Sequence, residues 1–446
     1  MIFVRKYEKS LKHGERYEKV FLAVSMLFVF ICGILWIRSL DRVPEGDQAF
    51  LYAGASYFME GDFSFFRKGG YCQIYPQQLD LMAFTELLFR IVGPYQYLAF
   101  EVMNVFMATG IVGIGYLLLK EMGGTYEARI LYCIAMICCS PLICYTSWVY
   151  GDVPGLFFLM LTALFVLKWQ STRKWPIGIW TVISGVLALL LRRNNLIFLI
   201  ALLLLSIVCV IGQRKWKTLL IVGTIYCGFV LCSSGIKEMY EIRSGYEVEK
   251  GLPANSWIAM GMQENRGVCG WYNNVPKEVA AREGWDYAKT EQEMKGIIKE
   301  RIRTFLSDPV YGATFYVKKV LSQWNDPTYQ GVYFSAKYNG DDRPKEGSLL
   351  SKLYDGENGY FKYFEWANIW QFVVYLGMFL YFCLIKYESG KALDRILAVT
   401  IIGGFFFSIL WEAKARYIFP YYLMMIPLMV QGYSMLMGKI LEKPEK

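Results

Sequence analysis

The sequence has little charge and almost no histidine. Only 19% of its 446 residues are charged, whereas soluble domains carry about 25%. Its one histidine is His13, and no two cysteines have the CxxC spacing, so zinc sites and histidine-based catalysis are not expected. The chain is 55% hydrophobic, mostly in long apolar runs. Together these properties exclude a soluble enzyme and a disordered chain, and they indicate a polytopic membrane protein.

The apolar runs predict an all-α fold with about ten transmembrane helices. The first run follows a basic segment and has no small-residue cleavage site after it, which indicates a signal anchor with a cytoplasmic N-terminus. The predicted spans are 20–37, 95–118, 128–148, 153–168, 176–191, 195–212, 218–236, 366–385, 396–411 and 417–438.

Basic residues fill every loop that this count places inside the cell. They are Lys120, Arg129, Arg173, Lys174, Arg214, Lys215, Lys217, Lys386, Lys391, Arg395, Lys439, Lys443 and Lys446. Because basic loops stay in the cytoplasm and contact anionic lipids, they account for most of the net charge of +9. A nucleic-acid partner is therefore not needed to explain that charge.

Two polar segments are predicted to protrude outside the membrane. The loop 38–94 contains an amphipathic stretch, 78–93, that is typical of a helix lying at the interface. The block 237–365 is rich in charge and has helical periodicity, which predicts a small, mostly helical outer domain. The organisation is thus an N-terminal transmembrane catalytic module (1–236), this outer domain, and C-terminal transmembrane helices (366–446).

Local signals predict two helix starts within the outer block. Thr290 and Glu293 have the spacing of a capping box, and Asp308 precedes Pro309 as an N-cap precedes the first turn of a helix. Cys72 and Cys269 fall in polar segments, so a disulfide between them is conceivable, although their spacing fixes no partner.

Two aspartates are candidates for chemistry. Acidic residues beside a span, such as Asp41, Glu45 and Asp62, are usually only solvated. Asp47 differs because it directly precedes a helical pattern, where backbone N–H groups can hold a carboxylate rigidly as a general base. Asp152 stands in a short outer turn, where it either caps the next helix or orients an acceptor or bound cation as a second carboxylate.

Two basic segments break the charge rule because they lie at predicted outer boundaries. They are Arg192-Arg193-Asn194-Asn195 and Glu412-Ala413-Lys414-Ala415-Arg416-Tyr417. One interpretation is snorkelling, or pairing with a loop carboxylate. The other is a site for an anionic lipid headgroup such as a phosphate. The residue types alone do not decide between them.

Four elements, in this order, resemble GT-C-type integral membrane glycosyltransferases of the protein O-mannosyltransferase and aminoarabinose transferase kind. They are Pro44 to Gln48 with Tyr75-Pro76, then Tyr150-Gly151-Asp152-Val153-Pro154, then Arg192-Arg193-Asn194-Asn195-Leu196, and finally Arg416-Tyr417. The resemblance covers most of the chain. It departs from the O-mannosyltransferases in having Asp47-Gln48 in place of Asp-Glu and in lacking an appended β-trefoil, which disfavours protein mannosylation.

The resemblance implies a hexosyltransferase that uses a polyprenyl-phosphate sugar and acts from the plasma membrane on its outer face. Asp47 would be the catalytic base, and Asp152 the second acidic residue. The implied substrate-binding residues are Arg192, Arg193, Asn194, Arg416, Tyr417, Tyr75 and Gln77, with the arginines holding the phosphate.

The chemistry implied is a single displacement that inverts the anomeric carbon. The expected acceptor is a cell-envelope glycan or protein. No cofactor is required, although a divalent cation is conceivable. Two alternatives stay open: a transporter or flippase of lipid-linked saccharides, and a polysaccharide polymerase or ligase. The first normally shows inverted repeats and charges at mid-bilayer, which this sequence does not display.

Overall fold

The computed structural model describes residues 2–40, 43–213, 216–335, 351, 353, 357–386 and 391–441. Asp41, Arg214, Lys215, Lys443 and Lys446 lie outside these residues. In the described part the chain is mostly helical, and its sheet is one antiparallel pair, β1 (Glu264–Asn265) with β2 (Val268–Cys269). The predicted all-α class is therefore confirmed.

Eight helices of the described chain are long and apolar enough to cross a membrane. These are α1 (Ile2–Ser39), α5 (Tyr97–Glu121), α8 (Asp152–Thr172), α10 (Leu196–Gln213), α11 (Lys217–Ser244), α18 (Glu357–Leu384), α19 (Ile396–Leu410) and α20 (Phe419–Leu441). The protein is thus a multi-pass membrane protein.

The two other predicted spans correspond to helices that depart from a simple crossing. One is a pair bent by 52°, α6 (Tyr126–Ile137) followed by α7 (Ser140–Cys144) and the 3₁₀ turn η3 (Tyr145–Ser147). The bend precedes Pro141, which cannot continue an upstream helix because it lacks an N–H group. The other is α9 (Trp175–Leu191), which is apolar but shorter than the rest.

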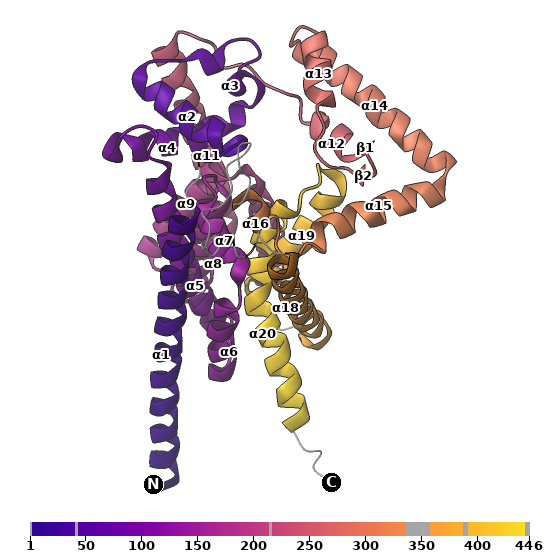
Figure 1. The fold of residues 1–446 in the computed structure, drawn as a ribbon. Helices are drawn as coiled ribbons and strands as arrows, with labels where there is room; N and C mark the ends of the chain where they lie inside the picture. The colour runs from indigo at the N-terminus through magenta and orange to yellow at the C-terminus, as the bar shows by residue number, and fades with distance from the viewer. Residues whose placement is uncertain are drawn as a thin grey trace.

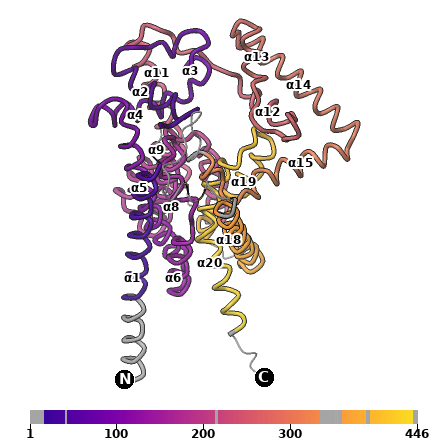
Figure 2. Tube along the Cα trace, viewed as in Figure 1, coloured from indigo at the N-terminus to yellow at the C-terminus, as the bar shows by residue number. Residues whose placement is uncertain are grey.

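The helices pack as a bundle in which the first turns of α1 and the last turns of α20 lie at the same end (Figures 1 and 2). The most extensive helix contacts join α8 to α9 and α18 to α20, while α1 packs against α5 and α6. Their shared core is dominated by Leu, Ile, Val, Met and aromatic side chains with little solvent exposure.

Two clusters of shorter elements lie at the end of the bundle away from the termini (Figure 1). The first contains α2 (Asp47–Glu60), η1 (Ser64–Phe66), α3 (Tyr71–Ile74), η2 (Pro76–Gln78) and α4 (Leu79–Val92). The second contains α12 (Asn255–Gly261), the β1–β2 pair, α13 (Val275–Arg282), α14 (Tyr287–Ser307) and α15 (Pro309–Trp324). The short helix α16 (Gly331–Ser335) follows and packs against α7 and η3 of the bundle. The helix predicted over 78–93 is α4.

The local predictions in these clusters had mixed outcomes. Asp308 caps α15 as predicted, accepting a hydrogen bond from the backbone N–H of Tyr311. The predicted capping box was wrong, because α14 starts earlier: Asp286 is its N-cap and Thr290 lies within the first turns, donating to the Asp286 carbonyl. An Asp followed by three helix-compatible residues offers an equally good cap upstream.

The conceivable disulfide does not form. Cys72 and Cys269 are both free thiols. The sulfur of Cys72, in α3, packs 3.5 Å from that of Met82, whereas Cys269 belongs to the β2 strand of the other cluster.

Candidate functional site

A polar cavity of about 360 Å³ lies where the two clusters meet the bundle. The first cluster contributes Asp47, Tyr75 and Gln77, and η6 (Ala415–Tyr417) contributes Arg416 and Tyr417. Further lining residues are Glu45, Gly46, Gln48, Phe50, Tyr71, Gln78, Trp148, Tyr150, Trp257, Tyr272, Lys277, Glu412 and Lys414. The cavity therefore joins segments from both halves of the chain.

Asp47 is the first residue of α2, and its backbone is placed by its two neighbours. Gly46 has φ 61°, a left-handed conformation that glycine adopts without strain. Gln48 is buried, and its Oε1 accepts a 2.8 Å hydrogen bond from the backbone N–H of Val149. The carboxylate of Asp47 lies 2.9 Å from a guanidinium nitrogen of Arg416. An arginine, and not the backbone N–H groups proposed from sequence, thus holds it.

Arg416 is buried beneath the cavity among aromatic rings. Its side chain is 5% exposed, against 37% for that of Asp47. Its guanidinium lies 5.2–5.5 Å from the ring centroids of Trp148, Tyr150 and Tyr417. A cation on aromatic faces away from water is strongly held. Arg416 is therefore a firmly held positive charge in the wall of the cavity, where it is paired with Asp47.

The charges around Asp47 keep its carboxyl ionised. Burial by itself would raise the pKa of this carboxyl, but the nearby Arg416, Lys414 and Arg192 together lower the pKa below its ordinary value. At neutral pH Asp47 is thus a carboxylate, as a general base must be. Its basicity is low while Arg416 is paired with it.

Asp152 forms a second ion pair beside the first. Its carboxylate lies 3.1 Å from the guanidinium of Arg192 and accepts a 2.8 Å hydrogen bond from the Trp148 indole. It is the first residue of α8, after Gly151 at the N-cap position, so it is not the helix cap suggested by the sequence. The Arg192 guanidinium lies 5.3 Å from the Tyr150 ring centroid, so Tyr150 contacts the arginines of both ion pairs.

Two glycines allow this close arrangement at the start of α8. A Cβ added to Gly151 would overlap the Leu191 carbonyl, and one added to Gly155 would lie 2.6 Å from the Arg192 Cβ. Small residues let the ends of α8 and α9 approach closely enough for Asp152 to reach Arg192.

Four of the predicted site residues, Asp152, Arg192, Arg193 and Asn194, do not line the main cavity. Arg193 turns toward α4 and α11, where its guanidinium lies 3.2 Å from Asp80 and 3.3 Å from the Ser233 hydroxyl. Asn194 lines a small neighbouring hollow with Asp152 and Arg192. Adjacent residues at the end of α9 therefore face different partners. Arg193 therefore matches the interpretation of a basic residue paired with a carboxylate of the predicted loop 38–94, which is Asp80.

Several cavity residues were not among the predicted site residues. Lys414 lies 3.3 Å from Glu412. It stands two residues before Arg416 in a segment already noted for its outer basic residues, so its spacing from Arg416 could have identified it as a site residue. Lys277 of α13 lies 5.2 Å from the Tyr75 ring centroid. The Trp257 ring stacks on Trp411 with centroids 5.8 Å apart. Lys277 and Trp257 come from the block 237–365, and no local motif marks them.

Within the described residues, no group of three or more His, Cys, Asp and Glu side chains is arranged to hold a metal ion. The carboxylates of Asp47 and Glu412 at the cavity each face a cation, Arg416 and Lys414 respectively. Use of a divalent cation, which the sequence analysis left open, therefore stays a prediction.

The fold and the cavity define a class: a multi-pass α-helical membrane protein with a polar, aromatic-walled cavity at one end of its bundle. Comparison with known proteins adds no narrower assignment, since no protein-family model and no curated protein matches this sequence.

Proposed function

We propose that the protein is a glycosyltransferase that moves a sugar from a polyprenyl-phosphate donor to an acceptor hydroxyl, with inversion. The observation that carries the proposal is the Asp47–Arg416 ion pair at the wall of the cavity. It sets a carboxylate suited to proton transfer beside a cation suited to phosphate. A volume of about 360 Å³ falls within the range of small-ligand sites.

In this proposal the donor phosphate activates the base. The phosphate approaches Arg416, with Lys414 and Lys277 as further cations at the same cavity. When the phosphate shares the Arg416 guanidinium, its negative charge offsets part of the positive charge beside Asp47, and the pKa of Asp47 rises. The base therefore becomes stronger when the donor is in place.

The reaction is then one displacement. The acceptor oxygen forms a bond to the anomeric carbon while the bond from that carbon to the phosphate oxygen breaks. The acceptor proton passes to Asp47, and polyprenyl phosphate leaves as an anion neutralised by the cations. Attack from the side opposite the leaving group inverts the anomeric centre. Arg192 and Asp152 act as the second layer that keeps Tyr150 and Arg416 in position.

The aromatic lining supports a sugar as the transferred group. Tyr75, Tyr272 and Trp257 line the cavity, and Trp257 is backed by its stack on Trp411. Aromatic faces offer apolar area, and the tyrosine hydroxyls offer hydrogen bonds. Such a mixture suits a hexose, which has apolar C–H faces and polar edges.

The proposal includes a topology. All ten apolar helices cross the plasma membrane with the termini in the cytoplasm, and the two clusters with the cavity face outward. The basic residues near the termini favour this orientation. Cell-envelope glycans or proteins are the acceptors in reach of such a cavity.

The decisive test is Asp47→Asn in membranes supplied with a polyprenyl-phosphate sugar, with release of polyprenyl phosphate and product mass as readouts. We expect transfer to fall by about 10²- to 10⁴-fold, the usual contribution of a general base. Asp62→Asn is the matched control, because Asp62 belongs to the same cluster but caps an exposed turn through Ser64.

Undiminished transfer by Asp47→Asn would refute the mechanism. Transfer of whole oligosaccharides would indicate a polymerase or ligase. Movement of lipid-linked sugar between leaflets with no product formed would indicate a flippase.

A further inference from the structure

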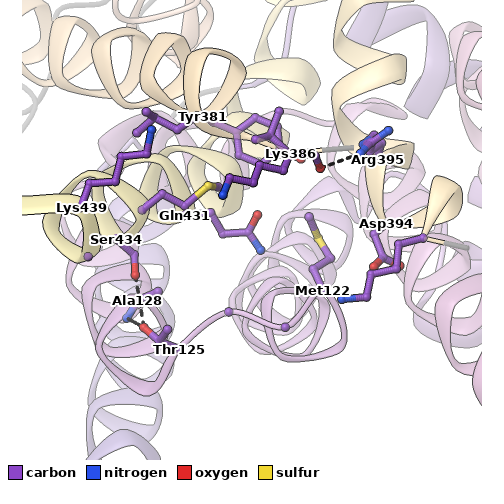
Figure 3. A pocket seen from close by; sticks show the side chains of 17 residues that line it. Met122, Thr125, Ala128, Tyr381, Lys386, Asp394, Arg395, Gln431, Ser434 and Lys439 are labelled. Carbon is purple, nitrogen blue, oxygen red and sulfur yellow. Dashed lines mark hydrogen bonds between the residues drawn. The ribbon is translucent and has the colours of Figure 1, made fainter. Parts of the chain in front are cut away.

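A second cavity, of about 460 Å³, opens at the opposite end of the bundle from the first. It lies between the α5–α6 turn, the C-terminal end of α18, the segment Lys391–Arg395 and the C-terminal half of α20. Figure 3 shows side chains from these elements surrounding it. None of the residues of the proposed glycosyltransferase site lines this cavity, so a ligand bound here is independent of the proposed function.

The charge of its described lining is mostly positive. Lys386, Lys391, Arg395 and Lys439 contribute cations, and Asp394 contributes the carboxylate. These cations come from segments that precede α19 and from the last turns of α20. The Arg395 guanidinium donates a 3.0 Å hydrogen bond to the Lys386 carbonyl, which ties two of the cationic residues together.

Neutral donors stand on another wall of the cavity. The Thr125 and Ser434 hydroxyls lie 3.3 Å apart, and Thr125 caps α6 by accepting from the Ala128 N–H (Figure 3). The N-terminus of α6, a 12-residue helix, therefore faces the same hollow with the positive end of its dipole. Hydroxyl groups, a helix N-terminus and several cations together are the donor set that phosphate prefers.

The lining also has an apolar part, to which Met122, Leu384 and Met435 contribute. Because the cavity lies where apolar helices end, this part is placed to meet the first carbons of a lipid chain. Basic pockets between transmembrane helices on the cytoplasmic side are a recurrent form of anionic lipid site.

The need for basic cytoplasmic loops does not by itself explain this arrangement. That rule requires positive charge near the membrane but not its convergence on one hollow. Here distant parts of the chain bring their cations and hydroxyls to the same cavity. We propose that this cavity binds a phosphate-bearing anion, supplied either as the headgroup of an anionic phospholipid or as a soluble phosphate compound.

The test uses the purified full-length protein and two probes. Native mass spectrometry counts bound phosphatidylglycerol, with phosphatidylcholine as the neutral comparison, and thermal stabilisation reports inorganic phosphate. The variant Lys386→Gln/Lys439→Gln removes two exposed cations of the cavity. Lys19→Gln/Lys174→Gln is the matched control, because these exposed lysines do not line the cavity.

We expect the cavity variant to bind its anion about 10- to 30-fold more weakly, and the control to bind as the unaltered protein does. Loss of phosphatidylglycerol alone identifies a lipid headgroup, and loss of phosphate stabilisation alone identifies a soluble ligand. Equal effects of both variants on both probes, or no preference for anions in the unaltered protein, would overturn the proposal. Lys391→Gln/Lys439→Gln provides a second cavity variant should the first fold poorly.

Discussion

Asp47 and Arg416 are separated by 369 positions in the sequence, and their 2.9 Å contact organises the candidate site. The pair has a consequence for stability as well as for chemistry. Because the pKa of Asp47 is lowered in the folded protein, the pair stabilises the fold above the ordinary pKa of an aspartate. That stabilisation is lost as the pH falls through the lower, folded pKa.

This pairing predicts that Arg416→Gln raises the pKa of Asp47. Without the guanidinium, burial acts with less opposition, so the carboxyl should protonate at higher pH. Infrared difference spectroscopy across a pH titration measures the protonated carboxyl band, and Asp47→Asn identifies it. An unchanged titration in Arg416→Gln would show that other charges set this pKa.

At the scale of elements, α4 shows what the tertiary structure adds to a sequence-based prediction. The predicted helix forms, and its acidic residues Asp80 and Glu86 are buried against α11, which the pattern did not indicate. Glu86 lies 2.9 Å from the guanidinium of Arg243 and accepts a 2.6 Å hydrogen bond from the Tyr240 hydroxyl. These ion pairs attach the first cluster to the extension of α11.

We expect Glu86→Gln to lower the free energy of unfolding by about 2–3 kcal/mol, because it leaves Arg243 without a buried counter-charge. The value is below that of a fully buried pair, since the Arg243 side chain is 28% exposed. Thermal unfolding in detergent measures the loss. Glu60→Gln, at an exposed position of α2, should change little, and an equal loss in both variants would contradict the assignment.

The helix α15 is joined to the bundle by a buried lysine. The ammonium group of Lys319 donates hydrogen bonds of 2.6 Å to the Gly261 carbonyl and 2.8 Å to the Ile409 carbonyl. Burial lowers the pKa of Lys319 to about 7, against the opposing influence of Glu412 and Cys269.

This lysine predicts a pH-dependent stability. Between about pH 7 and its ordinary pKa the unfolded chain binds a proton that the folded protein does not, so stability should rise with pH in that window. Lys319→Met should remove this rise, whereas Lys318→Gln, at the exposed neighbour, should keep it. Melting temperatures at pH 7, 8, 9 and 10 decide; an identical slope in Lys319→Met would contradict the prediction.

At the scale of the whole molecule, two polar cavities lie at opposite ends of an apolar bundle. The candidate site takes residues from both clusters, whereas the second cavity is built from helix ends near the termini. If the apolar helices cross a bilayer, the two cavities open to different aqueous compartments.

That arrangement predicts opposite accessibility of two lysine positions. Lys277→Cys, beside the candidate site, should react with a membrane-impermeant maleimide from outside intact cells. Lys174→Cys, before α9, should react only after the membrane is permeabilised. A cysteine-depleted background gives the baseline. Labelling of both variants in intact cells would contradict the topology.

The sequence by itself determined the membrane class, the positions of the apolar helices and some local features such as the Asp308 cap. A long apolar run that crosses a membrane has few stable conformations other than a helix, because every backbone polar group in the hydrocarbon must find an internal partner. A cap depends only on residues adjacent in the chain, so its signal is local.

Tertiary structure alone decided which charges meet. The sequence presented Arg192 and Arg193 as equivalent, yet one pairs with Asp152 beside the cavity and the other with Asp80 on α4. It gave no sign that Lys277 or Trp257 would line the same space as Asp47. Helix packing decides in which direction a side chain at a helix end points and which partner it meets across the bundle. A linear pattern of residues does not encode that geometry.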